Sequence, residues 1–170
     1  MSRALAVAAA ALALAGCSTN ESEAQQDEAQ VARVGDGDSI ELADGTRVRL
    51  VQIDAPELGV RECYGVEATD ALRELVPPGA FVRLEADPRL DDVDRFGRLL
   101  RYVHRDGVNV NLELVRRGAA SVWFVGGDSG RYAAERLNAA EEAHVARRGL
   151  WSACPGTELD PARGVQTRPG

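Results

Sequence analysis

The chain has 170 residues, 45% of them hydrophobic, and it carries a formal net charge of −7. This length suits one domain of ordinary size with tails. The acidic balance excludes a protein that coats nucleic acid by charge alone, but it permits a site that binds one phosphate through a few arginines. All the basic side chains apart from histidine are arginine. Arginine has a permanent, planar charge that matches phosphate oxygens, although genomic base composition is the simpler explanation for the missing lysines.

The N-terminus has the features of an export signal. Arg3 provides a positive start, and the apolar run over residues 5–14 is too short for a comfortable transmembrane helix. Residues 14–17 (Leu-Ala-Gly-Cys) resemble the lipobox of bacterial lipoproteins, in which cleavage before the cysteine leaves a thiol that receives lipid. This interpretation makes residues 1–16 a signal peptide and anchors the mature protein to an extracytoplasmic membrane face through Cys17. The alternative is an ordinary secretory signal, cut after a small residue, which would release the protein.

Two further segments are predicted to be disordered. Residues 17–28 are polar and acidic with nothing to bury, which is typical of a tether. Residues 155–170 are rich in Pro, Gly, Thr and Arg and are expected to form a disordered tail. The folded domain is therefore expected to span residues 29–154, as a monomer, and nothing in it indicates a protein partner.

The cysteine count favours one disulfide. If Cys17 carries lipid, Cys63 and Cys154 remain as an even pair in an oxidising compartment. A bond between them would close a long loop and stabilise the fold by restricting the unfolded chain. The alternative is two free, buried thiols.

The first half of the domain has the pattern of a β-barrel followed by one helix. Residues 29–34, 39–42 and 46–53 are predicted to be strands, because apolar residues alternate there and Gly- and Asp-rich turns separate them. Residues 64–76 place apolar side chains on one face of a helix, which the Pro-Pro-Gly at 77–79 ends.

The second half supplies two strands and two helices. Residues 80–86 and 97–104 are predicted strands, Asn109 caps a helix that Gly118 stops, and a longer helix spans residues 131–148. Five short strands with a helix between the third and the fourth suit a closed OB-fold barrel. The predicted fold class is therefore α+β, with a five-stranded OB-fold barrel and three helices.

Three short segments carry residues that phosphodiester cleavage needs: residues 36–39, 49–57 and 94–98. The reaction requires a positive charge near the phosphate and an activated water. Carboxylates bind hard cations and can take a proton from water, and arginine forms paired hydrogen bonds with phosphate. Taken one at a time, these residues have plainer explanations, such as turn-forming aspartates, a solvated strand arginine, or Arg98 paired with Asp94 on the surface.

These segments, with residues 63–68, 111–118 and 149–151, follow one another as they do in the staphylococcal nuclease family, also called thermonucleases, which the chain resembles from about residue 30 to 152. The resemblance implies an OB-fold enzyme that hydrolyses DNA and RNA phosphodiester bonds with Ca²⁺ and with little sequence preference. It implies that Arg49 and Arg98 bind the phosphate and that Glu57 is the general base or orients the attacking water. The implied calcium ligands are Asp38, Asp54 and the backbone carbonyl of Ala55.

The chain departs from the family at the nucleotide-binding positions. Arg95-Phe96 replaces a Lys-Tyr pair, so the phenol is lost while a positive charge is kept. Phe124 and Gly126 stand where the family has two tyrosines, and Phe124 keeps an aromatic face for stacking. The substrate-binding residues are therefore predicted to be Arg95, Phe96 and Phe124, whereas strand alternation would point Trp123 elsewhere.

Two other kinds of protein fit parts of the pattern. A non-catalytic OB module that binds single strands or a protein would typically lose the carboxylates and arginines, which this chain retains. A lipoprotein with a structural role in the envelope would show no metal-dependent activity.

Overall fold

The computed structural model describes residues 28–167. The predicted signal peptide (1–16), the lipidation site at Cys17 and the tether, apart from Glu28, lie outside the described residues, as do residues 168–170. Glu28 begins the first strand, one residue before the predicted start of the folded domain.

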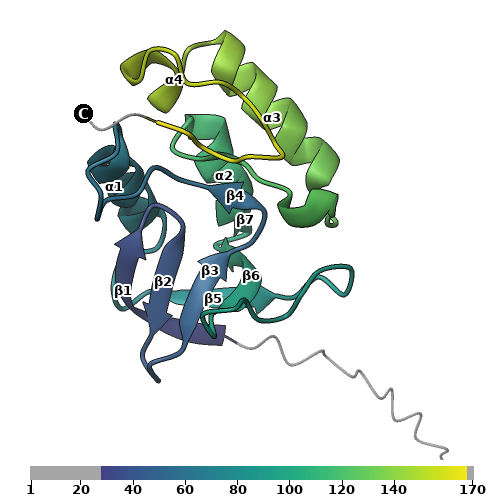
Figure 1. Ribbon diagram of the computed structural model, residues 1–170. Helices are drawn as coiled ribbons and strands as arrows, with labels where there is room; N and C mark the ends of the chain where they lie inside the picture. The colour runs from purple at the N-terminus through teal and green to yellow at the C-terminus, as the bar shows by residue number, and fades with distance from the viewer. Residues whose placement is uncertain (1–27, 168–170) are drawn as a thin grey trace, which may run out of the picture.

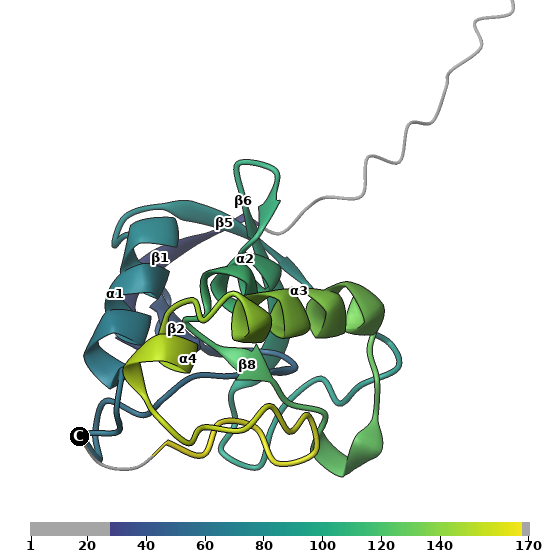
Figure 2. The same cartoon turned by 90° about the horizontal axis from the view of Figure 1, so that it is seen from above.

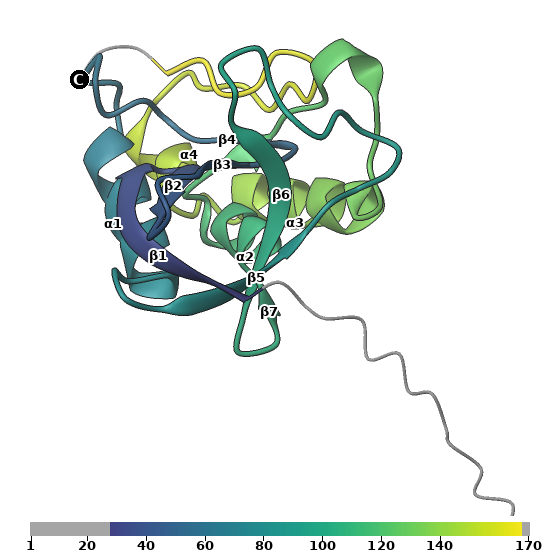
Figure 3. The same ribbon diagram turned by 90° about the horizontal axis from the view of Figure 1, so that it is seen from below.

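Five strands form a closed barrel of mixed orientation, which confirms the predicted fold class (Figure 3). Neighbouring strands are antiparallel except β3 and β6, whose parallel pairing of Val48 with Leu99 and of Arg49 with Leu100 closes the barrel. Two register shifts in the pairing of β1 with β2 help this nine-residue strand to curve around the barrel. The barrel strands are β1 (Glu28–Asp36), β2 (Ser39–Leu42), β3 (Arg47–Leu50), β5 (Phe81–Glu85) and β6 (Leu99–Arg105).

Helices and short strands cover the barrel, as Figures 1 and 2 show. Helix α2 begins and ends as the sequence predicts: the Asn109 side chain accepts a hydrogen bond from the Leu112 amide, and Gly118 adopts a left-handed conformation at φ 67°. Outside the barrel, the described residues form four helices, one 3₁₀ turn and three short strands. They are α1 (Gly65–Leu75), α2 (Val110–Arg117), α3 (Ala133–Val145), α4 (Leu150–Ala153), the 3₁₀ turn η1 (Val125–Gly127), and the strands β4 (Ile53–Asp54), β7 (Val108–Asn109) and β8 (Ser121–Val122).

The expected strand over residues 46–53 is broken, and this break positions the site. Strand β3 ends at Leu50, and Gln52 turns the chain in a left-handed conformation at φ 61°. The chain then pairs with a different strand, since Ile53 lies opposite Val122 and Asp54 opposite Ser121. Local alternation does not reveal the break, because the residues on both sides of it are buried.

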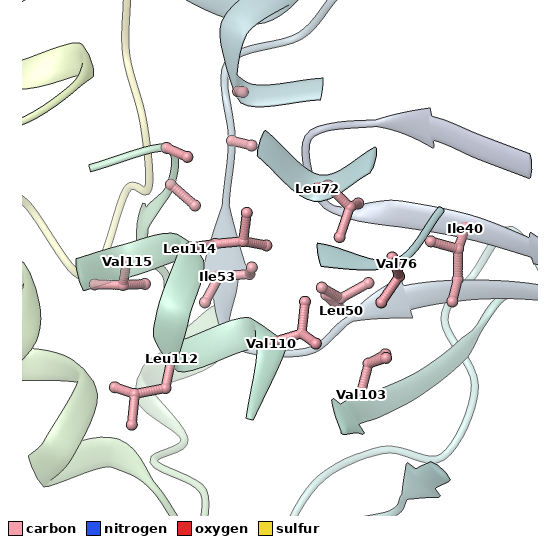
Figure 4. Close-up of a cluster of buried hydrophobic side chains, with 14 of the residues drawn as sticks. Ile40, Leu50, Ile53, Leu72, Val76, Val103, Val110, Leu112, Leu114 and Val115 are labelled. Carbon is pink, nitrogen blue, oxygen red and sulfur yellow. The ribbon is translucent and has the colours of Figure 1, made fainter. Parts of the chain in front are cut away.

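The core lies between the barrel, α1 and α2 (Figure 4). Leu50 and Ile53 from the broken strand meet Leu72 of α1 and Leu114 of α2 there, and all four are almost fully buried. Burying each such side chain contributes about 1.5–3 kcal/mol, so the turn between Leu50 and Ile53 is fixed by packing on both sides. None of the helices in residues 28–167 has both the length and the apolar character needed to cross a membrane.

A buried polar network joins α3 to the barrel at the Gln52 turn. The Gln52 side chain accepts hydrogen bonds from the Gly130 amide (3.0 Å) and from the guanidinium of Arg136, which is fully buried. Tyr102 donates to Asp87 (3.0 Å), and Arg136 lies over the Tyr102 ring at 4.9 Å. Because buried polar groups are costly when unpaired, this network fixes the turn that precedes Asp54.

Replacing Asp87 with Asn should reduce the stability of this connection. Burial raises the pKa of the Asp87 carboxyl, but hydrogen bonds from the Arg131 and Arg89 amides and from Tyr102 outweigh burial and lower the pKa to about 2. A carboxyl with a depressed folded-state pKa stabilises the fold above its unfolded value near 4 and loses this contribution as the pH falls toward 2. We expect Asp87→Asn to lower the free energy of unfolding by about 2 kcal/mol at pH 7. Urea unfolding at pH 7 and pH 2 should show a much smaller difference from wild type at pH 2 than at pH 7.

The segment after α4 is ordered as far as Thr167, which corrects the expectation of a disordered tail. In Figures 1 and 2 it returns from α4 across the end of the barrel that carries β4 and β8. Val165 is 5% exposed, and it packs with Trp151 and Cys154. The composition of the segment is polar, but its apolar residues Leu159 and Val165 pack against the domain and hold the segment in place.

The structure contains the predicted disulfide between Cys63 and Cys154. The bond joins the loop before α1 to the end of α4 and lies beside the buried side chains of Trp151 and Val165. It thus ties together two regions that border the candidate site described next.

Candidate active site

Two aspartates and one arginine converge where β2, β3 and β4 meet. Nη2 of Arg49 lies 2.8 Å from Asp38 Oδ2 and 3.0 Å from Asp54 Oδ1. Nη1 of the same guanidinium donates to the backbone carbonyls of Leu50 (3.0 Å) and Ile53 (2.9 Å). Arg49 therefore holds both carboxylates and the turn between them in one arrangement, from a side chain that is only 9% exposed.

The glycine turn before β2 brings Asp38 close to the chain at Ala55. A Cβ atom on Gly37 would lie 2.6 Å from the Ala55 Cβ and 2.9 Å from the Ala68 Cβ, so only glycine fits. This close approach lets Asp38 Oδ2 accept a hydrogen bond from the Ala55 amide at 2.9 Å. The predicted ligands Asp38, Asp54 and Ala55 are thus neighbours in space.

The two carboxylates are under-compensated by positive charge. Burial raises the pKa of Asp38 well above its usual value, and the charges of Asp36 and Asp54 raise it further against the opposing effect of Arg49. Burial likewise raises the pKa of Asp54, and Glu62 and Asp36 add to the increase. One guanidinium faces two buried carboxylates here, and a bound cation would favour the charged form of both.

The oxygen donors of the site suit a hard divalent cation, but they supply only part of its coordination shell. Asp38 and Asp54 offer carboxylate oxygens within 3.0 Å of the same arginine nitrogen, and the neighbouring Ala55 carbonyl is a further oxygen donor. Within residues 28–167, no three His, Cys, Asp or Glu side chains are grouped closely enough to hold a metal by themselves. Calcium accepts backbone carbonyls and waters beside carboxylates, so two aspartates are a sufficient start for such a site.

Glu57 is an exposed residue directly after Pro56, three positions beyond Asp54 in the chain. Burial raises the pKa of Glu57, and the charges of Asp36, Asp54 and Glu62 raise it further. Its backbone amide donates to Glu62 Oε2 at 2.9 Å, so the Glu62 side chain fixes the loop that carries it. The structure thus places Glu57 within electrostatic reach of the aspartates and adds Glu62, which sequence reasoning missed.

A cavity of about 590 Å³ opens beside Arg49. Arg98 lines it and is held by Asp94, which accepts from Arg98 Nε at 2.6 Å. Arg95 and Arg98 lie 4.7 Å and 5.4 Å from the centre of the Phe96 ring, and Phe96 is 56% exposed. The plainer explanation of Arg98, an ion pair with Asp94, is found in the structure. The pair uses Nε, the inner nitrogen of the Arg98 guanidinium, and Arg98 also lines the cavity.

The aromatic residue on the other wall is Trp123, which corrects the expectation for Phe124. Trp123 lines the cavity together with Val125 and Gly126. Phe124 instead packs against the hydrophobic core, and its amide donates to the Pro161 carbonyl at 2.7 Å. Because β8 ends at Val122, the alternation of side-chain direction does not continue through residues 123 and 124, and the prediction that Trp123 points elsewhere is wrong.

Two more residues at the site escaped sequence reasoning. Gln52 sets the turn before Asp54, and its left-handed backbone has no signal in a residue of this type. The Val165 amide donates to Asp54 Oδ2 at 2.9 Å. A backbone amide contributes the same group at every non-proline position, so no residue type could have indicated this contact.

Comparison with known proteins identifies what this arrangement is similar to. The sequence profile of the family described as Staphylococcal nuclease homologue matches residues 47–153. This range includes Arg49, Asp54, Glu57 and Arg98, and it ends just before Cys154.

Similar proteins of known name are endonucleases. The chain is 40% identical over 134 residues to a protein of Escherichia coli O157:H7 named Uncharacterized endonuclease, a match that covers 72% of this chain and 76% of that protein. It is 33% identical over 127 residues to Endonuclease YncB of Bacillus subtilis (strain 168), covering 71% of this chain and 59% of that protein. The SPbeta prophage-derived endonuclease YokF of the same organism is also 33% identical over 127 residues, covering 71% of this chain and 42% of that protein.

Proposed function

This chain belongs to the staphylococcal nuclease family, and from this premise we propose that it is a calcium-dependent nuclease that cuts DNA and RNA outside the cytoplasm. The enzyme class itself is a hydrolase of phosphodiester bonds, and the family is one of metal-dependent nucleases. The proposal adds the metal, the substrates, the roles of the residues and the location.

The observation that carries the proposal is the contact of one arginine with two aspartates beside an arginine-lined cavity. Asp38, Asp54 and the Ala55 carbonyl would hold Ca²⁺, which supplies positive charge for the phosphate and a more acidic bound water. Arg49 and Arg98 both line the cavity. There they would bind phosphate oxygens and strengthen their hold as negative charge develops.

Little sequence preference follows from the chemistry of these groups. Arginines that bind phosphate carry no information about the base, and Arg95, Phe96 and Trp123 offer a charge and flat faces that any base can use. Glu57 would take a proton from the attacking water or orient it.

Digestion of single-stranded DNA by the protein, with calcium and with a chelator, tests the function. We expect cleavage with calcium, none with chelator, and recovery when calcium is added back in excess. Magnesium and manganese in parallel determine the choice of metal. A folded protein that leaves DNA and RNA intact in calcium would contradict the proposal and favour the non-catalytic binding module.

Replacing Trp123 with Ala should weaken substrate binding. Stacking of a base on an aromatic side chain contributes about 1–3 kcal/mol, so we expect the KM for single-stranded DNA to rise about tenfold with a smaller change in kcat. The matched control is Phe124→Leu, which should lower the melting temperature and leave KM unchanged. A larger rise in KM for Phe124→Leu than for Trp123→Ala would return the stacking role to Phe124.

We also propose that the mature protein is a monomer on an extracytoplasmic membrane face, anchored by lipid on Cys17. The support is the lipobox-like sequence at residues 14–17, and the disulfide fits an oxidising compartment. The mass of the mature N-terminal peptide distinguishes a lipid-modified Cys17 from a plain secretory cleavage.

A further inference from the structure

The segment after α4 reaches the metal-binding side of the active site. Asp160 starts a compact turn, in which its carbonyl accepts from the amides of Arg163 (3.1 Å) and Gly164 (3.0 Å). The Phe124 amide binds Pro161 at one end of this turn, and buried Val165 lies at the other. The turn is therefore fastened on both sides and directs Gly164 and Val165 toward Asp54.

The fit between this turn and Asp54 requires glycine. A Cβ atom on Gly164 would lie 2.5 Å from Asp54 Oδ2 and 3.1 Å from Trp123 Cγ, and Gly164 has φ 70°. Both the space and the backbone conformation exclude a side chain at this position. The close approach allows the next amide, that of Val165, to donate to Asp54 Oδ2 at 2.9 Å.

Each oxygen of the Asp54 carboxylate thus has its own donor. Arg49 binds Oδ1 at 3.0 Å from β3, and the Val165 amide binds Oδ2 from the far end of the chain. Two donors from different elements fix the rotation of the carboxylate, which stands on a strand of only two residues. An amide carries no net charge, and a carboxylate oxygen has two lone pairs, so Oδ2 can accept this bond and still bind a cation.

We propose that residues 160–165 are part of the active site and that the Val165 amide is a positioning group for Asp54. The inference rests on the proposed role of Asp54 as a calcium ligand. Partners that orient a metal ligand typically change metal affinity by about 10–100-fold when they are removed. The Val165 side chain anchors the amide by packing beside Trp151 and the Cys63–Cys154 disulfide, and takes no part in binding itself.

The test compares three variants of the full chain. Val165→Pro removes the amide hydrogen, and Gly164→Ala forces the turn away from Asp54, while the control Val165→Ala keeps the amide and loses part of the packing. Calorimetry gives the calcium dissociation constant, and melting in chelator reports the fold without metal. We expect Val165→Pro and Gly164→Ala to weaken calcium binding about tenfold or more, with the KM for DNA at saturating calcium unchanged in Val165→Pro. Val165→Ala should melt at a lower temperature but weaken calcium binding less than Val165→Pro does, because the amide donor to Asp54 remains.

Calcium binding by Val165→Pro and Gly164→Ala equal to that of wild type would overturn the inference. Tighter binding with faster cleavage would also overturn it, because the segment would then obstruct Asp54. A wild-type protein that binds no calcium would instead contradict the proposed function, so the two failures are distinguishable.

Discussion

Glu57→Gln is expected to lower kcat for DNA cleavage by about 10²–10⁴-fold, the usual contribution of a general base. Glutamine keeps the size of the side chain and its position after Pro56 but cannot accept the proton. The fold should not change, because Glu57 is exposed and the Glu62 side chain binds its backbone amide rather than its carboxylate. Single-turnover cleavage of a short DNA at saturating calcium measures the effect on the chemical step.

The matched control is Glu67→Gln, which removes a carboxylate of the same kind from the first turn of α1. Glu67 is exposed, and its replacement should leave kcat as in wild type. A Glu57→Gln enzyme that keeps nearly full kcat would remove Glu57 from the reaction and leave the aspartates and arginines as the working groups.

Loss of the Cys63–Cys154 disulfide is expected to have the largest effect on stability. The bond joins residues separated by 91 positions, and a loop of that length corresponds to about 4.6 kcal/mol in the chain-entropy account. Domains of this kind are stable by only about 5–15 kcal/mol, so the double variant Cys63→Ala with Cys154→Ala should unfold at a much lower urea concentration.

Urea unfolding of wild type with and without a reducing agent provides the control for this prediction. Reduction should shift the wild-type midpoint toward that of the double variant and leave the double variant unchanged. Equal midpoints for oxidised wild type and the double variant would show that the bond adds no stability.

Much of the fold could be predicted because its signals are local. The cap at Asn109 and the stop at Gly118 are consequences of side-chain and backbone properties of single residues, and both are found in the structure. The break between β3 and β4 could not be predicted in the same way. It depends on Gln52 binding to Gly130 and Arg136, which lie about eighty residues further along the chain.

The candidate site likewise contains residues that could be predicted from the sequence and residues that could not. Asp38, Arg49 and Asp54 form the predicted group, because carboxylates and arginine have a recognisable chemistry and the barrel brings their strands together. Trp123, and not Phe124, lines the cavity because β8 ends at Val122. A strand of two residues is too short for alternation in the sequence to show where it ends. The contact from Val165 follows from packing of the whole segment and is a property of its backbone.

The position of Arg49 has a consequence for hydrogen exchange. Arg49 belongs to the strand pair that closes the barrel, where it lies opposite Leu100. The β3 amides that take part in this pairing are therefore expected to exchange only when the barrel opens. The turn at residues 160–165 is held by a few contacts at its two ends, so the Val165 amide should exchange through a smaller, local opening. The backbone segments that carry the two donors of Asp54 are thus expected to differ in how readily they open, β3 rarely and the turn at residues 160–165 more often.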